Sequence, residues 1–360
     1  MLANGLLSQG TFLVTGGAGF IGCAVSQVVA ASAERYVVVD NLHSQVHSAA
    51  LRPDRLHKAA ELVVADITEA STWERLLEEV CPTVVIHLAA ETGTGQSLVE
   101  STRHGMVNVV GTTQMLDALT RHGVRPNHVV LTSSRAVYGE GEWVRADGTN
   151  FYPGQRTHAQ LAAGLWDFPG ASPLASSASR TKPDPISIYG ATKLTQEHVL
   201  GAWCRSNDVP LTVLRFQNVY GPGQSLTNSY TGIVVLFSQL AALGKSIPLY
   251  EDGKVTRDFV FVDDAAAAIS AALQHPGRET ITIDIGSGEG LTIRALAEEI
   301  ARLHKAPSPT VTGMFRDGDV RHATCSVKLA WELLGWVPCW ELSKGLRALQ
   351  NWVMKEQGAN

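Results

Sequence analysis

Residues 11–22 read TFLVTGGAGFIG, an apolar run followed by four glycines, of which Gly16, Gly19 and Gly22 are spaced three residues apart. The run Thr11–Thr15 predicts a short strand, and a helical pattern continues from the last glycine to about Ala33. A strand, a glycine turn and a helix in this order are the setting of a dinucleotide-binding turn, because glycines let the backbone approach a pyrophosphate on the helix N-terminus. Taken alone, an ordinary glycine-rich turn between a strand and a helix explains the stretch equally well.

The next two predicted strands both end in an aspartate. The strand 36–39 ends in Asp40, 18 residues after Gly22, where a carboxylate can bond both ribose hydroxyls of a dinucleotide and repel a 2′-phosphate. This spacing favours NAD over NADP. The strand 61–65 ends in Asp66, which either meets the adenine or belongs to the N-terminal region of the helical segment 68–80. The residues leave both interpretations open.

Strand and helix patterns alternate six times between residues 11 and 216. Further strands are predicted at 83–88, 128–132 and 211–216, and helical patterns cover 98–122, ended by Gly123, and 189–205. The run 83–88 is continuously apolar, as expected of a strand buried on both faces. This alternation predicts an α/β fold with a Rossmann-type, doubly wound parallel sheet whose ligand lies at the carboxyl ends of the strands.

Candidate catalytic residues fall on that same predicted edge. Ser134 follows the strand 128–132, where a hydroxyl can hydrogen-bond a reacting oxygen, although serines are also common turn formers. In SIYGATK (187–193), a helix would place Tyr189 and Lys193 one turn apart on one face. The lysine ammonium would then favour the phenolate and make the tyrosine a general base. Asn108 either holds backbone near the site or faces solvent.

Two regions depart from the alternation. Residues 140–185 are rich in Gly, Pro and Ser, so we expect an insertion that packs its aromatic side chains locally and covers the active site. A partly disordered loop or an oligomer contact are the alternatives. Gly221-Pro222-Gly223 terminates regular structure, so we expect a NAD-binding domain over 1–221, with 257–275 as a candidate return to it, and a smaller mixed α/β domain over 222–360 that binds substrate. In that second part the residues predict helices at 230–243, 263–274, 293–304 (capped by Thr292), 326–334 and 341–355, a strand at 280–285, and a strand pair at 247–250 and 257–262.

Composition bounds the class of protein. The chain has 360 residues, of which 45% are hydrophobic and 18% charged, so it can bury a large core. A net charge of −5 without a Lys/Arg block gives no case for nucleic acid or an anionic membrane. The five cysteines lie far apart, which fits reduced thiols better than disulfides or a zinc site. No apolar run approaches the ~20 residues of a membrane span, so we expect a soluble cytoplasmic protein. We also expect no bound metal.

Eight stretches stand in the order typical of one protein family. They are GGAGFIG (16–22), Asp40, HLAA (87–90), Ser134 four residues before Tyr138, Tyr189 with Lys193, LRFQNVYGPG (214–223), RDFVFVDD (257–264) and RDGDVR (316–321). With them the chain resembles the extended short-chain dehydrogenases/reductases of the nucleotide-sugar epimerase/dehydratase group, over about residues 10–355 apart from the insertion. The resemblance implies that NAD is bound by Gly16, Gly19, Phe20, Ile21, Gly22, Asp40, Asn41, Asp66, Ile67, Leu88, Ala89, Ala90, Asn108, Ser133, Tyr189 and Lys193.

The resemblance also implies a mechanism. Tyr189 takes the proton of a sugar hydroxyl, Lys193 lowers its pKa and holds the nicotinamide ribose, and Ser134 bonds the same sugar oxygen. A hydride passes to NAD and returns to the other face of the sugar, so the enzyme epimerises its substrate without net oxidation. The diphosphate of a dTDP- or UDP-hexose would be held by Asn218, Arg257 and Arg321, while the role of Arg316 stays open. Family members commonly form homodimers through two helices, which here are about 98–122 and 190–205.

One departure from the family pattern narrows the reaction. The 4,6-dehydratases of the family carry an acidic pair directly after the catalytic hydroxyl, where this chain has Arg135 and Ala136. The resemblance therefore favours a 4-epimerase over a dehydratase, and Asp40 disfavours the NADPH-dependent reductases. The insertion, with QLAAG at 160–164, is similar to that of epimerases that convert dTDP-L-rhamnose to dTDP-6-deoxy-L-talose. A UDP-glucose or UDP-N-acetylglucosamine 4-epimerase, or an oxidoreductase or decarboxylase of the same fold, are the alternatives.

Overall fold

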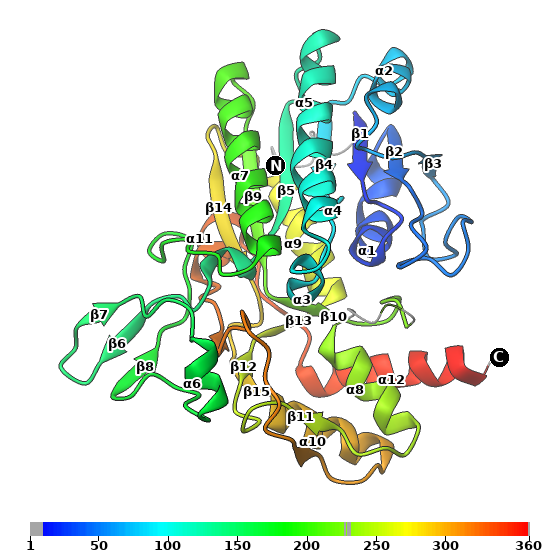
Figure 1. Cartoon of the computed structure of the whole chain (residues 1–360). Helices are drawn as coiled ribbons and strands as arrows, with labels where there is room; N and C mark the ends of the chain where they lie inside the picture. Colours follow the sequence, from blue (N-terminus) through cyan, green and yellow to red (C-terminus); the bar gives the residue numbers. More distant parts are fainter. Residues whose placement is uncertain (1–9, 227, 229–231, 359–360) are drawn as a thin grey trace.

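A parallel sheet of seven strands forms the centre of the protein in this computed structural model, which describes residues 10–226, 228 and 232–358 (Figure 1). The strands lie in the order β14-β9-β5-β4-β1-β2-β3 and all neighbours are parallel. Their bounds are β1 Thr11–Thr15, β2 Arg35–Asp40, β3 Ala60–Val64, β4 Val84–His87, β5 His128–Ser134, β9 Leu211–Phe216 and β14 Ile281–Ile285. The order reverses between β1 and β4, the position at which doubly wound sheets bind their ligands.

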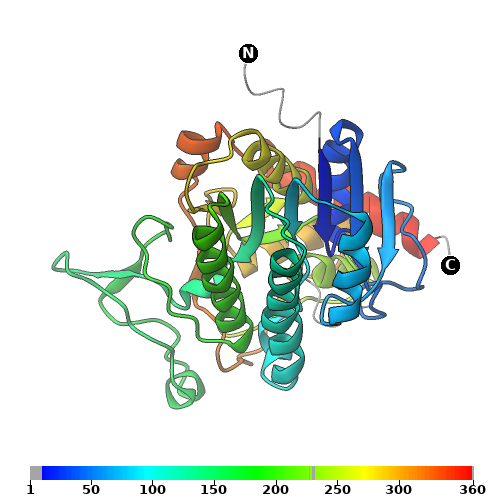
Figure 2. The ribbon, with the colours of Figure 1, turned by 90° about the horizontal axis from the view of Figure 1, so that it is seen from above.

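Helices cover both faces of the sheet (Figure 1, Figure 2). On one face lie α1 Phe20–Val29, α9 Val262–Gln274 and α11 Lys328–Leu334, and on the other α2 Ala70–Glu79, α5 Gly111–Arg121 and α7 Ile188–Asn207. The strand side chains alternate between the two cores, as Phe12 and Val14 of β1 join the first and Leu13 the second. The predicted Rossmann-type doubly wound fold is therefore confirmed.

The sheet gains its seventh strand from a late part of the chain. After Gly221-Pro222-Gly223 the chain builds part of the C-terminal region, and then α9 packs against α1 and β14 pairs with β9. The strand predicted at 280–285 is correct in position, but the prediction of six strands in the sheet missed that it extends the sheet. A five-residue strand with the sequence ITIDI does not by itself indicate which sheet it joins.

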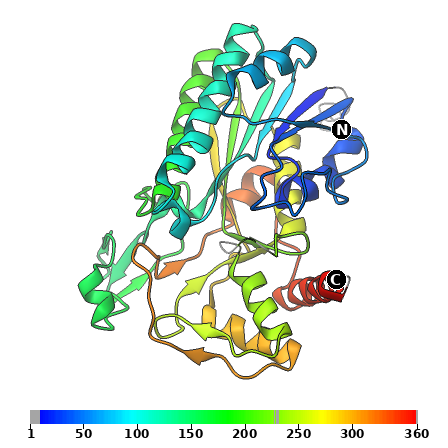
Figure 3. The same ribbon diagram turned by 45° about the vertical axis from the view of Figure 1, so that its right-hand side comes forward.

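The C-terminal region lies beneath the carboxyl edge of the large sheet (Figure 3). Its helices are α8 Ile233–Ala242, α10 Ile293–His304 and α12 Leu342–Gly358, and the predicted Thr292 cap accepts a hydrogen bond from Ala295 N at 3.1 Å. Short strands pair as β10 Asn218–Tyr220 with β13 Phe259–Phe261, β11 Pro248–Leu249 with β16 Thr310–Val311, and β12 Thr256–Arg257 with both β15 Leu291–Thr292 and β17 His322–Ala323. The predicted pairing of 247–250 with 257–262 is wrong, because these segments each pair with strands far away in the sequence.

The helical pattern predicted at 98–122 is interrupted. It comprises α3 Thr94–Ser97, α4 Ser101–Gly105, a π-helical turn Met106–Val110 and α5, and Gly123 ends it with φ +65°. The π turn holds Asn108, whose buried side chain points away from solvent. Such a turn is frequent where a side chain has a function in the interior.

The insertion 140–185 folds as a small unit that projects beside the sheet (Figure 2). Strands β7 Asn150–Phe151, β6 Trp143–Arg145 and β8 Ala171–Pro173 form an antiparallel sheet. The helix α6 His158–Ala162 lies between β7 and β8 in the sequence. The buried Trp143 ring lies 4.9 Å from Phe168 and 5.4 Å from His322. The expected local packing is confirmed for Trp143 and Phe168, whereas the Trp166 ring lies 6.2 Å from that of Phe315 in the C-terminal region. Among the described residues, no helix is long and apolar enough to cross a membrane.

Candidate active site

The glycine turn between β1 and α1 forms one wall of the site. Gly16 has φ +66°, and a Cβ there would lie 2.7 Å from the backbone of Ala89 at the end of β4. A Cβ on Gly22 would lie 2.5 Å from Gly17, so only glycine lets α1 begin directly above the turn. At Gly19 a Cβ would meet only the Gly16 carbonyl oxygen, at 3.3 Å. The turn thus offers bare backbone and a helix N-terminus to an anion.

Asp40 stands beside this turn at the end of β2. One carboxylate oxygen accepts a hydrogen bond from Ala18 N at 3.1 Å and the other from Leu42 N at 2.9 Å. These bonds fix the carboxylate where β2 reaches the cavity. The neighbouring Asn41 donates to Asp66 at 3.0 Å, and Asp66 also accepts from Thr68. Burial raises the pKa of Asp66, but the bonds from Thr68 and Asn41 outweigh it and lower the pKa overall.

These residues line a cavity of about 410 Å³ along the carboxyl edge of the sheet. Every residue expected to contact the dinucleotide lines it except Asn108. The amide of Asn108 instead bonds both backbone groups of Glu91, at 2.7 and 3.1 Å, and donates to Thr192 on α7 at 3.0 Å. The expected contact of Asn108 with the cofactor is not met, and of its two alternatives the structure shows the one that holds backbone. No residue of 140–185 lines this cavity, so within the described chain the insertion does not cover the expected dinucleotide site, and its covering of the sugar-binding part stays a prediction.

Ser134, Tyr189 and Lys193 meet at one end of the cavity. Ser134 is the last residue of β5, and its hydroxyl accepts a bond from Ala136 N at 3.1 Å. The helix α7 begins at Ile188 because the Ser187 hydroxyl caps it through Gly190 N at 3.0 Å. This start places Tyr189 and Lys193 one turn apart.

Burial dominates the electrostatics of the Tyr189/Lys193 pair. Burial raises the pKa of Tyr189, while the hydrogen bond of Ser134 and the charge of Arg135 lower it. Lys193 is not among the groups that lower this pKa, and its ammonium donates to Gln196 on the same helix. Burial also lowers the pKa of Lys193 to about 7. Ser134 and Arg135, and not Lys193, thus lower the pKa of Tyr189 in this arrangement, and activation of Tyr189 by Lys193 stays a prediction.

A buried hydrogen-bond network behind Lys193 was not foreseen from the sequence. Because the Gln196 oxygen accepts from Lys193, its nitrogen must donate, and it does so to His87 Nε2 and to the Thr112 hydroxyl, both at 2.9 Å. His87 Nδ1 then carries the proton toward Thr15 at 2.6 Å. Burial, and then the charge of Lys193, lower the pKa of His87 to about 3, so the imidazole is neutral. Gln196 lies three residues after Lys193, and that spacing was the available signal.

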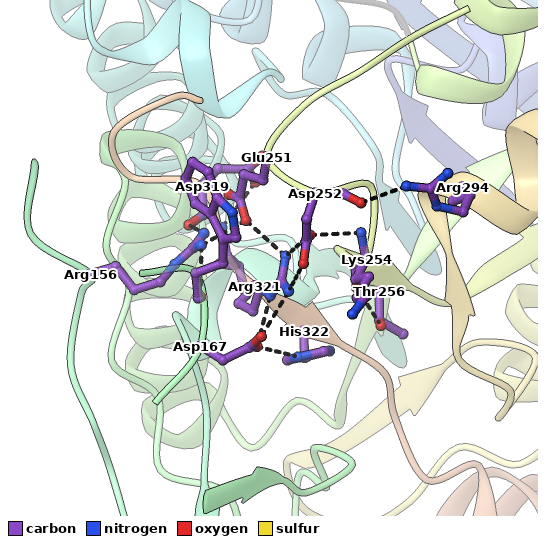
Figure 4. Close-up of polar contacts among 12 residues, drawn as sticks. Arg156, Asp167, Glu251, Asp252, Lys254, Thr256, Arg294, Asp319, Arg321 and His322 are labelled. Carbon is purple, nitrogen blue, oxygen red and sulfur yellow. Dashed lines mark hydrogen bonds and ion pairs between the residues drawn. The ribbon is translucent and has the colours of Figure 1, made fainter. Parts of the chain in front are cut away.

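The three residues expected to hold a diphosphate do not form a single binding site. Asn218 accepts a bond from Arg135 Nε at 2.9 Å, and Arg257 is buried with one terminal nitrogen 2.7 Å from Asp319. Arg321 lies in a separate cluster (Figure 4), where it makes five hydrogen bonds to the carboxylates of Asp167, Glu251 and Asp252. A guanidinium has five N–H donors.

Arg321 is therefore a structural residue in this protein. Its side chain is 1% exposed, and the carboxylates around it leave no donor for a ligand. The expectation that it grips the diphosphate is not met, because its partners come from distant parts of the chain. The buried Arg156 of the insertion joins the same cluster through Glu251, at 2.9 Å, and through Glu140, at 3.1 Å.

Arg316, whose role the sequence left open, stands apart from that cluster. It is exposed, and its guanidinium lies 5.0 Å from the centre of the Tyr250 ring.

Comparison with known proteins is consistent with this geometry. The model of a family described as the NAD dependent epimerase/dehydratase family matches residues 12–286. A dTDP-L-rhamnose 4-epimerase of Burkholderia thailandensis is 60% identical over 344 residues, which cover 96% of this chain and 95% of that protein. A UDP-glucose 4-epimerase of Mycolicibacterium smegmatis is 32% identical over 93% of this chain and 95% of that protein.

Solved structures show the same architecture. The crystal structure of a UDP-glucose 4-epimerase with UDP-glucose from Thermotoga maritima has a TM-score of 0.78 at 28% identity and covers 96% of this chain and 99% of that one. The Thermus thermophilus UDP-glucose 4-epimerase in complex with NAD has a TM-score of 0.75 at 27% identity, with the same coverage.

Proposed function

This chain belongs to the NAD dependent epimerase/dehydratase family, and we propose that it inverts carbon 4 of a nucleotide-activated hexose, interconverting dTDP-L-rhamnose and dTDP-6-deoxy-L-talose. One observation carries the choice of reaction. A serine and a tyrosine stand together at the end of a dinucleotide cavity, and the next two residues, Arg135 and Ala136, offer no acid to protonate a leaving hydroxyl. Oxidation and reduction at one carbon are therefore favoured over elimination of water.

The cofactor that fits this cavity is NAD. The glycine turn presents bare backbone to a pyrophosphate, and the carboxylate of Asp40 is held where a ribose would lie and where a 2′-phosphate would be repelled. NAD, when bound, supplies the acceptor for a hydride and then gives the hydride back. The backbone around Gly16 and Gly19 would hold the pyrophosphate, and Lys193 and Tyr189 would lie at the nicotinamide end.

The residues of the chain move the proton and orient the sugar. Tyr189 takes the proton from the 4-hydroxyl as a general base, and the Ser134 hydroxyl bonds the same oxygen. The 4-keto sugar then rotates in the site so that the opposite face of carbon 4 is reduced. Tyr189 returns its proton to the oxygen on carbon 4. Asn218 and Arg257 would hold the diphosphate, since Asn218 closely follows β9 and both residues lie near Arg135.

The choice of dTDP-L-rhamnose rests on similarity. The relative at 60% identity aligns along 96% of the chain, and the insertion resembles that of epimerases with this substrate. The UDP-glucose 4-epimerases at 28–32% identity make UDP-hexoses the second candidate.

A screen that identifies the product tests the proposal. Purified protein would be given dTDP-L-rhamnose, UDP-glucose and UDP-N-acetylglucosamine without added cofactor, and the products identified by proton NMR. We expect dTDP-L-rhamnose to reach an equilibrium with its 4-epimer while no NADH accumulates. Stoichiometric NADH or a dehydrated sugar would refute epimerisation. Tyr189→Phe should keep its NAD and lose turnover, and full activity in that variant would refute the assigned base.

We further propose that the enzyme works as a homodimer in the cytoplasm. Leu98 and Val99, between α3 and α4, and Met106, in the π-helical turn, leave apolar side chains exposed along the first of the two segments expected to meet. In the described chain all five cysteines are free, with Cys81 and Cys339 exposed, as expected in a reducing compartment. Light scattering that gives the mass of a monomer would contradict the dimer, and recovery of the native protein outside the cytoplasm would contradict the location.

A further inference from the structure

Arg135 is an arginine whose charge has no carboxylate partner at hydrogen-bond distance. It begins the short helix η4 (Arg135–Tyr138) directly after Ser134, and its Nε donates to Asn218 at 2.9 Å. Within the described chain, its two terminal nitrogens take part in no hydrogen bond or ion pair. The nearby Arg257 differs, because one of its terminal nitrogens is paired with Asp319. Arg135 is half-buried, so solvent screens its charge only in part.

The backbone holds Arg135 close to Tyr189. The helix η4 packs on the first turn of α7, where a Cβ on Gly190 would collide with the Ala136 carbonyl oxygen. The Ser134 hydroxyl fixes the start of η4 through Ala136 N. On the other side, Asn218 follows β9, which pairs with β5 up to Ser134. The guanidinium is therefore anchored between the catalytic hydroxyls and the place expected for the diphosphate.

Titratable or charged groups approach Tyr189 from three elements. Lys193 comes from α7 itself, but its ammonium is directed to Gln196, and the next charge on that helix, Glu197, is paired with Arg215 at 2.7 Å. His104 on α4 lies edge-on with its ring centre 6.4 Å from that of the tyrosine. The third is Arg135 on η4.

Arg135 itself is surrounded by both signs of charge. Burial and then the charge of Arg257 lower its pKa, while Asp319, Tyr189 and Glu140 raise it. An additional negative charge at Tyr189 would therefore be favourable to Arg135, as the cation is to the phenolate.

We propose that Arg135 is a second cation that serves the catalytic base: its guanidinium, anchored on Asn218, stabilises the phenolate of Tyr189 during epimerisation. The inference rests on the function proposed above. It gives a role to the residue that stands where dehydratases carry an acid, since the same position here supports proton removal from the 4-hydroxyl.

The test compares three variants at one residue. Arg135→Lys keeps the charge, whereas Arg135→Met and Arg135→Gln remove it, and the glutamine retains a donor toward Asn218. We expect the acid limb of the kcat/KM profile to move up by about one pH unit in the two neutral variants, because an opposite charge at this range shifts a pKa by about 1–3 units. The lysine variant should keep the limb of the parent enzyme. Activity in the neutral variants should then be about tenfold below the parent at acidic pH and approach it at alkaline pH.

Equal loss at every pH, or an unchanged limb in a folded neutral variant, would overturn the proposal. NAD content and thermal unfolding of each variant show whether it is folded, and the glutamine variant serves if the methionine variant is not. Ultraviolet titration, with Tyr189→Phe as the blank, measures the pKa of the Tyr189 phenol directly and without substrate, and the neutral variants should show the same upward shift of this pKa. An enzyme that turns over no 4-epimer would refute the proposed function, whereas this titration would still decide the role of Arg135.

Discussion

Replacing Arg321 by methionine should destabilise the fold without weakening substrate binding. The side chain is 1% exposed and makes five hydrogen bonds to three carboxylates. In the variant, Asp167 and Asp252 can rehydrate because they are 52% and 27% exposed, but Glu251 is 2% exposed and would keep only Arg156. Breaking one partner of a buried ion pair costs about 3–5 kcal/mol, and the surviving Arg156 bond places this site at about 3 kcal/mol.

The assay is urea unfolding of the parent enzyme and two variants. Arg316→Met is the matched control, because Arg316 lies in the same loop, is exposed, and has only its stacking on Tyr250 to lose, about 0.5–1 kcal/mol. We expect the urea midpoint of Arg321→Met to fall by the equivalent of about 3 kcal/mol of unfolding free energy, with the KM for the nucleotide sugar unchanged below the transition. Parent-like stability combined with a raised KM would refute the structural role and restore Arg321 as a substrate ligand.

Three further predictions follow from the cavity and the sheet. Asp40→Ser should lower the preference for NADH over NADPH by about tenfold or more in fluorescence titrations, because bonds to a charged group contribute about 1.5–3 kcal/mol; an unchanged preference would contradict its role. Gln196→Met should lower kcat by about tenfold with NAD still bound, because the Lys193 ammonium loses its acceptor, while the exposed control His198→Met keeps the parent rate. Burial raises the pKa of Asp284 to about 6, so the stability it contributes is complete below its unfolded pKa of about 4 and lost as the pH rises through about 6. Asp284→Asn should therefore gain about 2–3 kcal/mol on the parent between about pH 4 and pH 7 in urea unfolding, and a constant difference would contradict the shift.

The sheet could be predicted from sequence because its strands are long and buried. Apolar runs such as 11–15, 84–87 and 211–216 fill both cores, so the continuity of the runs and their alternation with helical patterns carry the signal. The two-residue strands β11 and β12 carry no periodicity, and their partners lie far along the chain, which is why their pairing was predicted wrongly. The strands of the insertion 140–185 could not be predicted either, because they are also only two or three residues long.

The site was predictable where backbone geometry decides it. The topology of the parallel sheet brings the glycine turn and the carboxyl ends of β2, β4 and β5 to one cavity, independently of how individual side chains are paired. Partners within hydrogen-bond networks were not predictable. Arg321 meets Asp167 from 154 residues away, and nothing local distinguishes it from an arginine that faces a ligand. Similarly, the sequence does not reveal that Lys193 donates to Gln196 or that the guanidinium of Arg135 has no carboxylate partner at hydrogen-bond distance within the described chain.

The most direct test of the central claim follows a label at carbon 4. If one carbon is oxidised and then reduced in a single site, dTDP-L-rhamnose deuterated at carbon 4 should give 4-epimer that keeps the deuterium at carbon 4, without added cofactor. NMR and mass spectrometry of the equilibrium mixture would measure this. Retention of the label in both epimers is the predicted result. Exchange of the deuterium with solvent, or formation of a product that has lost water, would contradict epimerisation by hydride removal and return.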